Sequence, residues 1–256
     1  MIPKKIHYCW FGGNPKPKLA QKCIKSWKKY CPDYEIIEWN EDNYDISAAP
    51  LYVRQAYEAK KWAFVTDYVR LQLIYENGGI YFDTDVQIIH KIDGFLSNKA
   101  YFGMENDRYV NTGLGFGAEK GSPVLKRMMD DYRDIAFVLE DGSFDDTPCP
   151  KRNSHVFSEY GAALDNTVEH FDDFTLFPSD YFCPLDWDTK KLDKTRNTYT
   201  IHWYSASWWD EKKQELHKSY QKKKKIDAFI HFPNKMLIRI MGNEKYDKLK
   251  KLFGRK

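Results

Sequence analysis

Two aspartates one residue apart, Asp83 and Asp85, directly follow the apolar residues Ile80-Tyr81-Phe82. Side chains alternate between the two faces of a strand, so a strand that continues through Thr84 would place both carboxylates on one side, about 7 Å apart. Two like charges on an otherwise buried strand are costly unless a cation compensates them. The pair therefore predicts a site for a hard divalent ion, with the polar end of a strand entering a loop as the simpler alternative.

Two further charged residues, Asp67 and Arg70, lie in the segment Trp62–Tyr75, which is apolar on nearly every side. This pattern predicts a helix packed in a core, ended by Asn77-Gly78. Residues three apart share one face of a helix, so Asp67 and Arg70 are neighbours. They form either an internal salt bridge or a charged face in the cleft that holds the aspartate pair.

A late histidine, His202, lies in a predicted strand that begins at Tyr199 and ends in the Ser- and Trp-rich segment 205–209. A neutral imidazole can serve as a third metal ligand beside two carboxylates. The alternative is the edge of an aromatic core with a hydrogen-bonded histidine.

The N-terminal residues predict a strand over Ile2–Trp10, a turn at Gly12-Gly13, a helix over Leu19–Tyr30 and a strand over Tyr34–Trp39. Strand, helix and strand in this order open an α/β nucleotide-binding sheet. The chain contains neither the Gly-x-Gly-x-x-Gly fingerprint nor a Walker Gly-Lys-Ser/Thr sequence, which argues against a nicotinamide cofactor and P-loop chemistry.

The middle of the chain predicts two strands, a loop between them, and two helices separated by a longer loop. The loop 140–155 is expected to border the substrate cleft, and the shapes of both loops, 105–112 and 140–155, are expected to decide which substrates fit. The strands are expected at Ala100–Glu105 and Leu114–Ala118, and the helices at Ser122–Leu139 and Ser158–Val168.

The composition fits a globular protein of one domain, or one domain with an appendage: 256 residues, 42% hydrophobic and 30% charged. The five cysteines are odd in number and lack Cys-x-x-Cys spacing, so they indicate neither a disulfide framework nor a zinc site. No apolar run reaches the roughly 20 residues of a membrane span, and the N-terminus lacks a signal-peptide layout. We therefore expect a cytoplasmic protein.

The charge is distributed unevenly along the chain. Residues 211–256 carry 15 Lys and Arg against 5 Asp and Glu, whereas residues 1–210 carry 25 against 32. A basic tail with interspersed apolar clusters is typical of a helix that lies on an anionic membrane surface, although a solvated tail, a contact between copies and a nucleic-acid partner are alternatives. We expect the inner face of the cell membrane as the partner and no nucleic acid.

This interpretation of residues 211–256 can be tested with a version of the chain that ends at Asp210. We expect the whole chain to float with anionic liposomes and the shortened chain to remain behind. Equal flotation would contradict the membrane interpretation, and steeply salt-dependent binding to duplex DNA would favour nucleic acid instead.

Four separated blocks of the sequence together resemble glycosyltransferase family 32. This group of Asp-x-Asp sugar transferases includes capsular polysaccharide enzymes and yeast mannosyltransferases, with the clostridial glucosylating toxins as distant relatives. The blocks occur in the family's order over about residues 1–210, at Ile6–Gly13, Ala63–Arg70, Asn77–Asp85 and His202–Trp208. The resemblance implies a GT-A fold, which is α/β with a Rossmann-like mixed central sheet flanked by helices, over residues 1–210, and a basic, partly helical tail over 211–256.

The resemblance also implies roles on the donor side. Trp10 would stack on the base of a nucleotide sugar, and Tyr81 would line the same pocket. Asp67 and Arg70 would hold the hydroxyls of the donor sugar and the diphosphate side, and Asn111 would lie near the transferring sugar. The residues implied in catalysis are Asp67, Arg70, Asp83, Asp85 and Asn111.

For the metal, the resemblance implies Asp83 and Asp85, which would bind ribose and ion, completed by His202. Ser207 and Trp208 would contact the leaving diphosphate, although Ser205 could take the role given to Ser207. Hard oxygen ligands suit Mg²⁺ or Mn²⁺, and one imidazole favours Mn²⁺.

The implied function is a metal-dependent retaining glycosyltransferase of surface polysaccharide synthesis. It would move a sugar from a nucleotide donor, with UDP favoured, to a glycan or lipid-linked saccharide. Two alternatives remain: a transferase that modifies proteins, and a non-catalytic protein that binds nucleotide sugars.

Overall fold

The computed structural model describes residues 1–205, Ser219 and Gly242. The chain divides into two units, Met1–Ser205 and Ala206–Lys256, and the helices and strands below all belong to the first. The amphipathic tail predicted for 211–256 lies outside the described residues, and the boundary near residue 210 stays a prediction.

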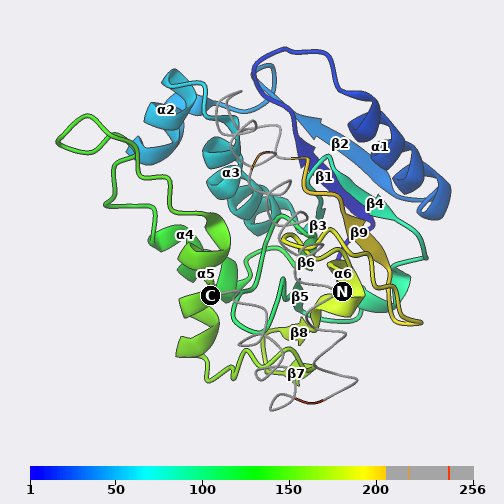
Figure 1. The fold of residues 1–256 in the computed structure, drawn as a ribbon. Helices are drawn as coiled ribbons and strands as arrows, with labels where there is room; N and C mark the ends of the chain where they lie inside the picture. Colours follow the sequence, from blue (N-terminus) through cyan, green and yellow to red (C-terminus); the bar gives the residue numbers. More distant parts are fainter. Residues whose placement is uncertain (206–218, 220–241, 243–256) are drawn as a thin grey trace, which may run out of the picture. The chain divides into compact units, whose positions relative to one another are not determined.

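A seven-stranded mixed sheet lies at the centre of Met1–Ser205 (Figure 1). Its strands are β1 Lys5–Cys9, β2 Glu35–Trp39, β3 Gly79–Tyr81, β5 Ala100–Gly103, β6 Phe116–Ala118, β7 Glu169–His170 and β8 Thr175–Phe177, in the order β2-β1-β3-β6-β5-β8-β7. The first three are parallel, β6 runs antiparallel to its neighbours β3 and β5, β8 is parallel to β5, and β7 is antiparallel to β8. Two more strands, β4 Val86–Ile88 and β9 Thr200–His202, form a separate antiparallel pair.

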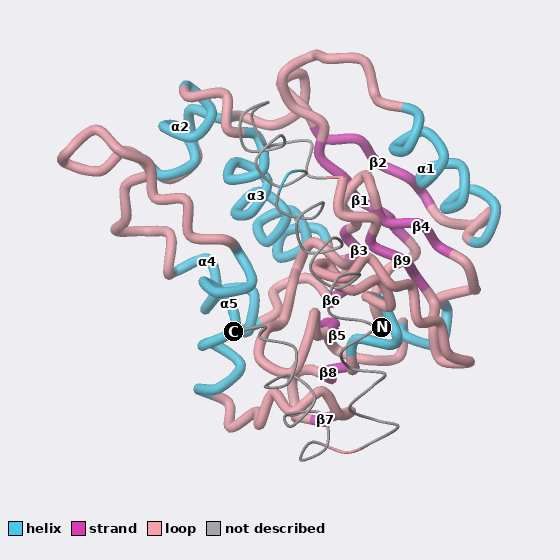
Figure 2. The backbone as a smooth tube through the Cα atoms, viewed as in Figure 1, coloured by secondary structure: helices cyan, strands magenta, loops and turns pink. Residues whose placement is uncertain are grey.

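Helices cover both faces of the central sheet (Figure 2). They are α1 Lys18–Tyr30, α2 Leu51–Glu58, α3 Trp62–Asn77, α4 Pro123–Asp130, α5 Cys149–Glu159 and α6 Ser179–Phe182, with 3₁₀ turns at Ile46–Ala48 and Asp93–Phe95. Residues of α1 share one apolar core with Ile80 and Phe82, and residues of α2 to α5 share another with Tyr81. The predicted α/β class, with a Rossmann-like mixed sheet between helices as expected of a GT-A fold, is confirmed.

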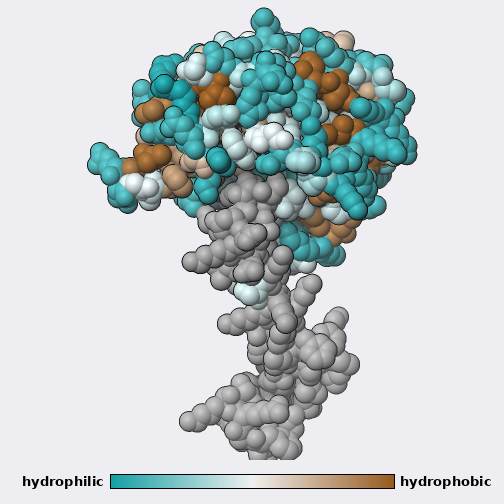
Figure 3. Space-filling view, turned by 90° about the horizontal axis from the view of Figure 1, so that it is seen from above, coloured by the Kyte–Doolittle hydropathy of each residue, from teal (hydrophilic) through white to brown (hydrophobic). Residues whose placement is uncertain are grey.

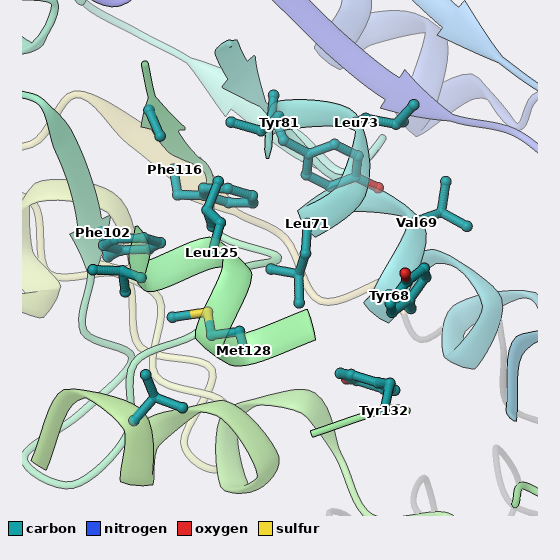
Figure 4. Packing of buried hydrophobic residues seen from close by; sticks show 14 of the residues in the cluster. Tyr68, Val69, Leu71, Leu73, Tyr81, Phe102, Phe116, Leu125, Met128 and Tyr132 are labelled. Carbon is teal, nitrogen blue, oxygen red and sulfur yellow. The ribbon is translucent and has the colours of Figure 1, made fainter. Parts of the chain in front are cut away.

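The buried helix predicted at Trp62–Tyr75 is α3, which extends to Asn77 and ends at Gly78 with a φ of +65°. Figure 4 shows its apolar residues between the sheet and α4, with Leu71 near Leu125 and Met128. The Tyr68 ring packs edge-on against Tyr132, with 5.5 Å between the centroids. Such a fully packed helix is a rigid base for any charged side chain that it carries.

The prediction that one strand continues through both aspartates is wrong. β3 ends at Tyr81, and a turn follows in which the Val86 N–H donates to the Asp83 carbonyl oxygen over 3.0 Å. Aspartate suits such turns because its side chain can bond nearby backbone groups. The two carboxylates therefore belong to the turn between β3 and β4, and pleat alternation does not explain their convergence.

Three other boundaries also differ from the prediction. The helix expected to reach Leu139 is α4 and ends at Asp130. The loop expected over 140–155 contains the start of α5, because Pro148 and Pro150 flank its first residue, where the missing proline N–H is no loss. The helix expected at Ser158–Val168 is wrong, since α5 ends at Glu159 and a loop follows.

One buried histidine, His7 of β1, joins three segments of the sheet region. The Trp39 indole N–H donates to its Nδ1 over 3.0 Å, so the neutral ring carries its proton on Nε2, which donates to the Gly78 carbonyl oxygen over 3.1 Å. Burial lowers the pKa of His7 to about 4, with Lys5 lowering it further and Glu35 and the Gly78 bond raising it. The folded state therefore requires the neutral imidazole.

We predict that this histidine makes the fold sensitive to mild acid. Its pKa is about 4 in the folded state and about 6.5 when unfolded, so the unfolded chain binds more protons between these values and stability falls with falling pH. The contribution amounts to about 2 kcal/mol between pH 7 and pH 5, measurable by urea unfolding. In His7→Gln the loss over this interval should shrink by that amount; an unchanged pH dependence would contradict the prediction.

The face in Figure 3 is largely hydrophilic, with apolar residues in scattered patches. The most exposed large apolar residues after Met1 are Leu51, Leu139 and Phe144, each less than half exposed. Within the described part of the chain, none of the helices has the length and apolar character needed to cross a membrane.

Candidate active site

The pairing of β4 with β9 brings the aspartate turn and the late histidine together. Val86 lies opposite His202 in this pair, and beyond it the Trp203 N–H donates to the Asp85 carbonyl oxygen over 3.1 Å. Two segments more than a hundred residues apart in the sequence thus lie side by side (Figure 1). This pairing places the His202 ring against the Asp85 carboxylate.

The side chains of Asp83, Asp85 and His202 form one cluster. Each offers a ligand atom, and these three atoms lie within 4.8 Å of one another. His202 Nε2 lies 3.2 Å from Asp85 Oδ1, while its Nδ1 is buried without a hydrogen-bond partner. Two carboxylates and one imidazole this close together fit a divalent cation, so the chemistry of this donor set supports the predicted metal site.

Asp85 is held firmly as a carboxylate. The Ser205 N–H donates to its Oδ2 over 2.7 Å, and His202 faces its Oδ1. Burial alone would raise the pKa of Asp85, but these partners outweigh burial and hold the pKa well below its usual range. The same pairing outweighs burial at His202 and raises the pKa of its imidazole.

Asp67 and Arg70 form the predicted ion pair on α3, with 2.7 Å between Oδ1 and Nη2. Arg70 is only 3% exposed, and its Nε donates to the Thr66 carbonyl oxygen over 2.9 Å. Burial raises the pKa of Asp67 to about 6, against the opposing effect of Arg70. Asp67 and Arg70 therefore form an internal salt bridge. The pair also faces the aspartate turn, because Arg70 contacts Asp83 as well.

Asp83 connects α3 to the metal cluster. Its Oδ2 lies 3.5 Å from Arg70 Nη1, and its Oδ1 accepts a hydrogen bond from the Tyr81 hydroxyl over 3.0 Å. Burial, together with the charge of Asp85, raises the pKa of Asp83, which Arg70 opposes. The Arg70 guanidinium also lies over the Tyr81 ring, 5.3 Å from its centroid. Four of the predicted residues thus form one continuous network, and Asp83 also belongs to the cluster with Asp85 and His202. The four are Asp67, Arg70, Tyr81 and Asp83.

Asn111 lies in the same region, buried and 7% exposed. The loop that carries it is a hairpin beyond β5, in which the Asn111 N–H donates to the Gly103 carbonyl oxygen over 3.1 Å. Its side-chain Oδ1 accepts from the Gly113 N–H over 2.7 Å, and its Nδ2 donates to Glu105 over 3.3 Å. The amide therefore has a fixed orientation, with one N–H left for another partner.

Trp10 follows β1, which is parallel to β3, so Trp10 and Asp83 both follow the carboxyl ends of neighbouring strands. Ligands of open α/β sheets bind at this edge. The Trp10 indole donates to the Asn14 carbonyl oxygen over 2.6 Å, and Lys16 Nζ lies 5.7 Å from the ring centroid. Its role in base stacking stays a prediction.

The predicted turn after β1 contains Gly12, which has a packing role. A Cβ at Gly12 would meet the Trp62 ring at 2.7 Å, and the residue has a φ of +86°. Gly12 is therefore required by the packing of Trp62, whereas a Cβ at Gly13 would meet nothing within 4 Å.

Ser207 and Trp208 lie outside the described residues, so their predicted contacts with the diphosphate stay predictions. Ser205 is described, and its backbone N–H is committed to Asp85.

The sequence interpretation missed three neighbours of the site. Gly113 is so close to Asp83 that a Cβ would lie 2.4 Å from its Oδ2. Cys149, the first residue of α5, lies 3.9 Å from Arg70 Nη1 and 3.7 Å from Asn111 Oδ1. Glu105 contacts Asn111 from the other side. Of these three residues, only Cys149 has a signal in the sequence, the prolines on either side of it. They were interpreted as part of a loop and not as the start of a helix.

Comparison with known proteins gives similarities to sugar transferases. The chain is 28% identical over 140 residues to inositol phosphoceramide mannosyltransferase 3 of Schizosaccharomyces pombe, covering 53% of this chain and 38% of that protein. The chain thus spans less than half the length of this relative.

Two solved structures are similar at low identity. PaToxG glycosyltransferase matches with a TM-score of 0.48 at 19% identity, covering 62% of this chain and 68% of that one. A glycosyltransferase involved in the glycosylation of the major capsid of PBCV-1 matches with a TM-score of 0.44 at 12% identity, covering 85% and 98%.

A family model covers the part of the chain that contains α1, α3 and the aspartate turn. It matches residues 17–102 and is described as the glycosyltransferase sugar-binding region containing DXD motif. In this chain the motif is Asp83-Thr84-Asp85. Residues 17–102 thus match the sugar-binding region of the DXD glycosyltransferases, which confirms the predicted resemblance.

Proposed function

We propose that this protein is a metal-dependent, retaining glycosyltransferase. It transfers a sugar from a nucleotide donor, UDP-linked by preference, to a saccharide or glycolipid acceptor in surface polysaccharide synthesis. The observation that carries this proposal is the convergence of Asp83, Asp85 and His202 within 4.8 Å, at the end of a DXD sugar-binding region.

The donor set favours Mn²⁺, with Mg²⁺ as the alternative, because two hard carboxylates are joined by one imidazole. A cation bound by Asp83, Asp85 and His202 would stabilise, as a Lewis acid, the charge that develops on the departing nucleoside diphosphate. The three ligand atoms lie within 4.8 Å of one another, which is close enough for one such ion to bind all three.

The other residues of the network bind and orient the donor. Arg70 keeps a permanent positive charge near Asp83, where it can attract the diphosphate, and Asp67 holds the guanidinium in place. The remaining N–H of Asn111 can donate to a sugar oxygen. Positioning of this kind supplies much of the rate of group-transfer reactions.

Retention is the stereochemical outcome that we propose. Inversion needs a carboxylate that is available as a base against the acceptor hydroxyl. At the described site, each of four carboxylates already has partners. Asp67 and Asp83 both contact Arg70, and Asp83 also accepts from Tyr81. Asp85 is paired with His202, and Glu105 accepts hydrogen bonds from two side chains. We therefore propose departure and attack on one face of the sugar, through an ion-pair-like transition state.

The named relative is a mannosyltransferase whose name gives a phosphoceramide as acceptor. This supports a lipid-linked acceptor here and adds mannose to the candidate sugars. A lipid-linked acceptor is also compatible with the expected location at the inner face of the cell membrane through residues 211–256, which remains part of the proposal.

The test is a panel of UDP- and GDP-linked sugars, each with Mn²⁺ or Mg²⁺, with released nucleoside diphosphate as the readout. We expect turnover of at least one donor that stops with a chelator. Binding of a donor without transfer or hydrolysis would instead indicate the non-catalytic alternative, and absence of binding would contradict the proposal. Transfer to a protein acceptor alone would favour the protein-modifying alternative.

A further inference from the structure

Glu105 lies at the base of the hairpin that carries Asn111. Met104 and Val110 form a bridge across this hairpin, and the Glu105 N–H donates to the Tyr109 carbonyl oxygen over 2.8 Å. At its tip, Asn106 Oδ1 accepts two backbone N–H groups, a turn that is typical of asparagine. The backbone position of Glu105 is therefore fixed without the help of its side chain.

The two carboxylate oxygens of Glu105 bind side chains from two distant segments. Oε2 accepts from Asn111 Nδ2 over 3.3 Å, and Oε1 accepts from the Tyr204 hydroxyl over 2.8 Å. Asn111 belongs to the hairpin, whereas Tyr204 follows the strand that ends in His202. One carboxylate thus joins the proposed sugar side of the site to the metal side.

Tyr204 is held in an unusual conformation. Its φ is +51°, a left-handed value that costs a non-glycine residue about 1–3 kcal/mol and persists only when its surroundings enforce it. Besides Glu105, its hydroxyl contacts Cys183 Sγ at 2.9 Å. Its ring lies 4.2 Å from that of His202, centroid to centroid. The position of Tyr204 therefore determines where the His202 ring can lie.

The next residue adds a second connection to the metal side. The Ser205 N–H, directly after Tyr204, donates to Asp85 Oδ2 over 2.7 Å. A shift of Tyr204 would move both the ring beside His202 and the donor to Asp85. Groups that orient metal ligands in this way typically change affinity for the ion 10–100-fold when they are removed.

We propose that Glu105 is a positioning residue that couples Asn111 to the metal ligands through Tyr204. The proposal rests on the proposed function for the identity of the ion. It assigns Glu105 no contact with substrate and no role as a base.

The first test measures Mn²⁺ binding to the full chain by calorimetry, without donor. Glu105→Ala and Tyr204→Phe should each weaken binding about tenfold, and the double variant should be no weaker than either, because both changes break one connection. Glu105→Gln should bind within about threefold of the parent, since its amide can still accept from Asn111 and donate to the Tyr204 oxygen. Glu58→Ala, at an exposed position at the end of α2, is the matched control.

The second test does not depend on a metal. Cys183 is buried, and its thiol contacts the Tyr204 hydroxyl. Loss of Glu105 should release Tyr204 and speed labelling of Cys183 by a thiol reagent, measured by peptide mass spectrometry, while Glu105→Gln should leave the rate unchanged.

The two tests separate the failure of each idea. If the parent chain binds no Mn²⁺, the proposed metal site fails, and the labelling rate still decides whether Glu105 holds Tyr204. If Glu105→Ala changes neither Mn²⁺ affinity nor Cys183 labelling, or if its effect and that of Tyr204→Phe simply add, the positioning role is overturned.

Discussion

Replacing Asp85 with alanine is expected to lower kcat/KM for sugar transfer by a factor of about 10³ or more. Asp85 is the carboxylate most firmly held in its charged form, with Ser205 and His202 on its two oxygens. Charge stabilisation of a leaving group by a bound ion is worth several kcal/mol, and each 1.36 kcal/mol changes the rate about tenfold. Released nucleoside diphosphate measures the loss.

The Asp85→Ala loss should be chemical and not a loss of fold. Calorimetry should show Mn²⁺ binding abolished or strongly weakened, while the circular dichroism spectrum remains that of the parent. Asp172→Ala removes an aspartate from an exposed loop and should keep the parent rate and affinity. Parental activity in Asp85→Ala would rule out the proposed mechanism, because the described residues contain no other cluster of three such metal-ligating side chains.

The elements that carry the site could be predicted because their patterns are local. The all-round apolar character of α3 reflects its burial in the core, and the apolar residues of β1 reflect its place inside the sheet. Asp83, Asp85 and His202 were predicted by chemical type, since two like charges in a buried region need a compensating cation. The structure brings the three side chains within 4.8 Å of one another, and their role as metal ligands stays a prediction.

The geometry of that convergence could not be predicted. Whether a strand continues through Asp83 or turns after Tyr81 depends on β4 leaving the central sheet to pair with β9, and this pairing is a tertiary choice. The register that sets Glu105 beside Asn111 likewise depends on the hairpin around Asn106. Neither choice leaves a periodic signal in the sequence.

The start of α5 could not be predicted for a different reason. Pro148 and Pro150 surround Cys149, and prolines in an Asp- and Gly-containing stretch usually indicate a loop. Proline is also common in the first turn of a helix, so the same residues are compatible with a loop and with the start of a helix. The helix is favoured here because Val156 and Phe157 are buried in the core, where the Phe157 ring packs against Phe102 and Phe174. Local composition does not reveal this packing.

Gly113→Ala is expected to lower kcat/KM about 100-fold while leaving the fold intact. The new Cβ would lie 2.4 Å from Asp83 Oδ2 and 3.0 Å from both Arg70 Nη1 and Asn111 Oδ1. These neighbours are side-chain ends and not backbone, so the clash is relieved by rotating Asp83 rather than by moving the sheet. Rotation would cost Asp83 its contacts with Tyr81 and Arg70, and a misplacement of about 1 Å can cost 10²-fold in rate.

Gly94→Ala is the matched control for Gly113→Ala, since a Cβ at Gly94 would meet nothing within 4 Å. It should keep the parent rate. Thermal unfolding of both variants should lie close to that of the parent, and Mn²⁺ binding should be weakened only in Gly113→Ala, because Asp83 is one of the three clustered ligands. A fully active Gly113→Ala would show that Asp83 can leave its observed position without loss, and would place the essential charge on Asp85 and His202 alone.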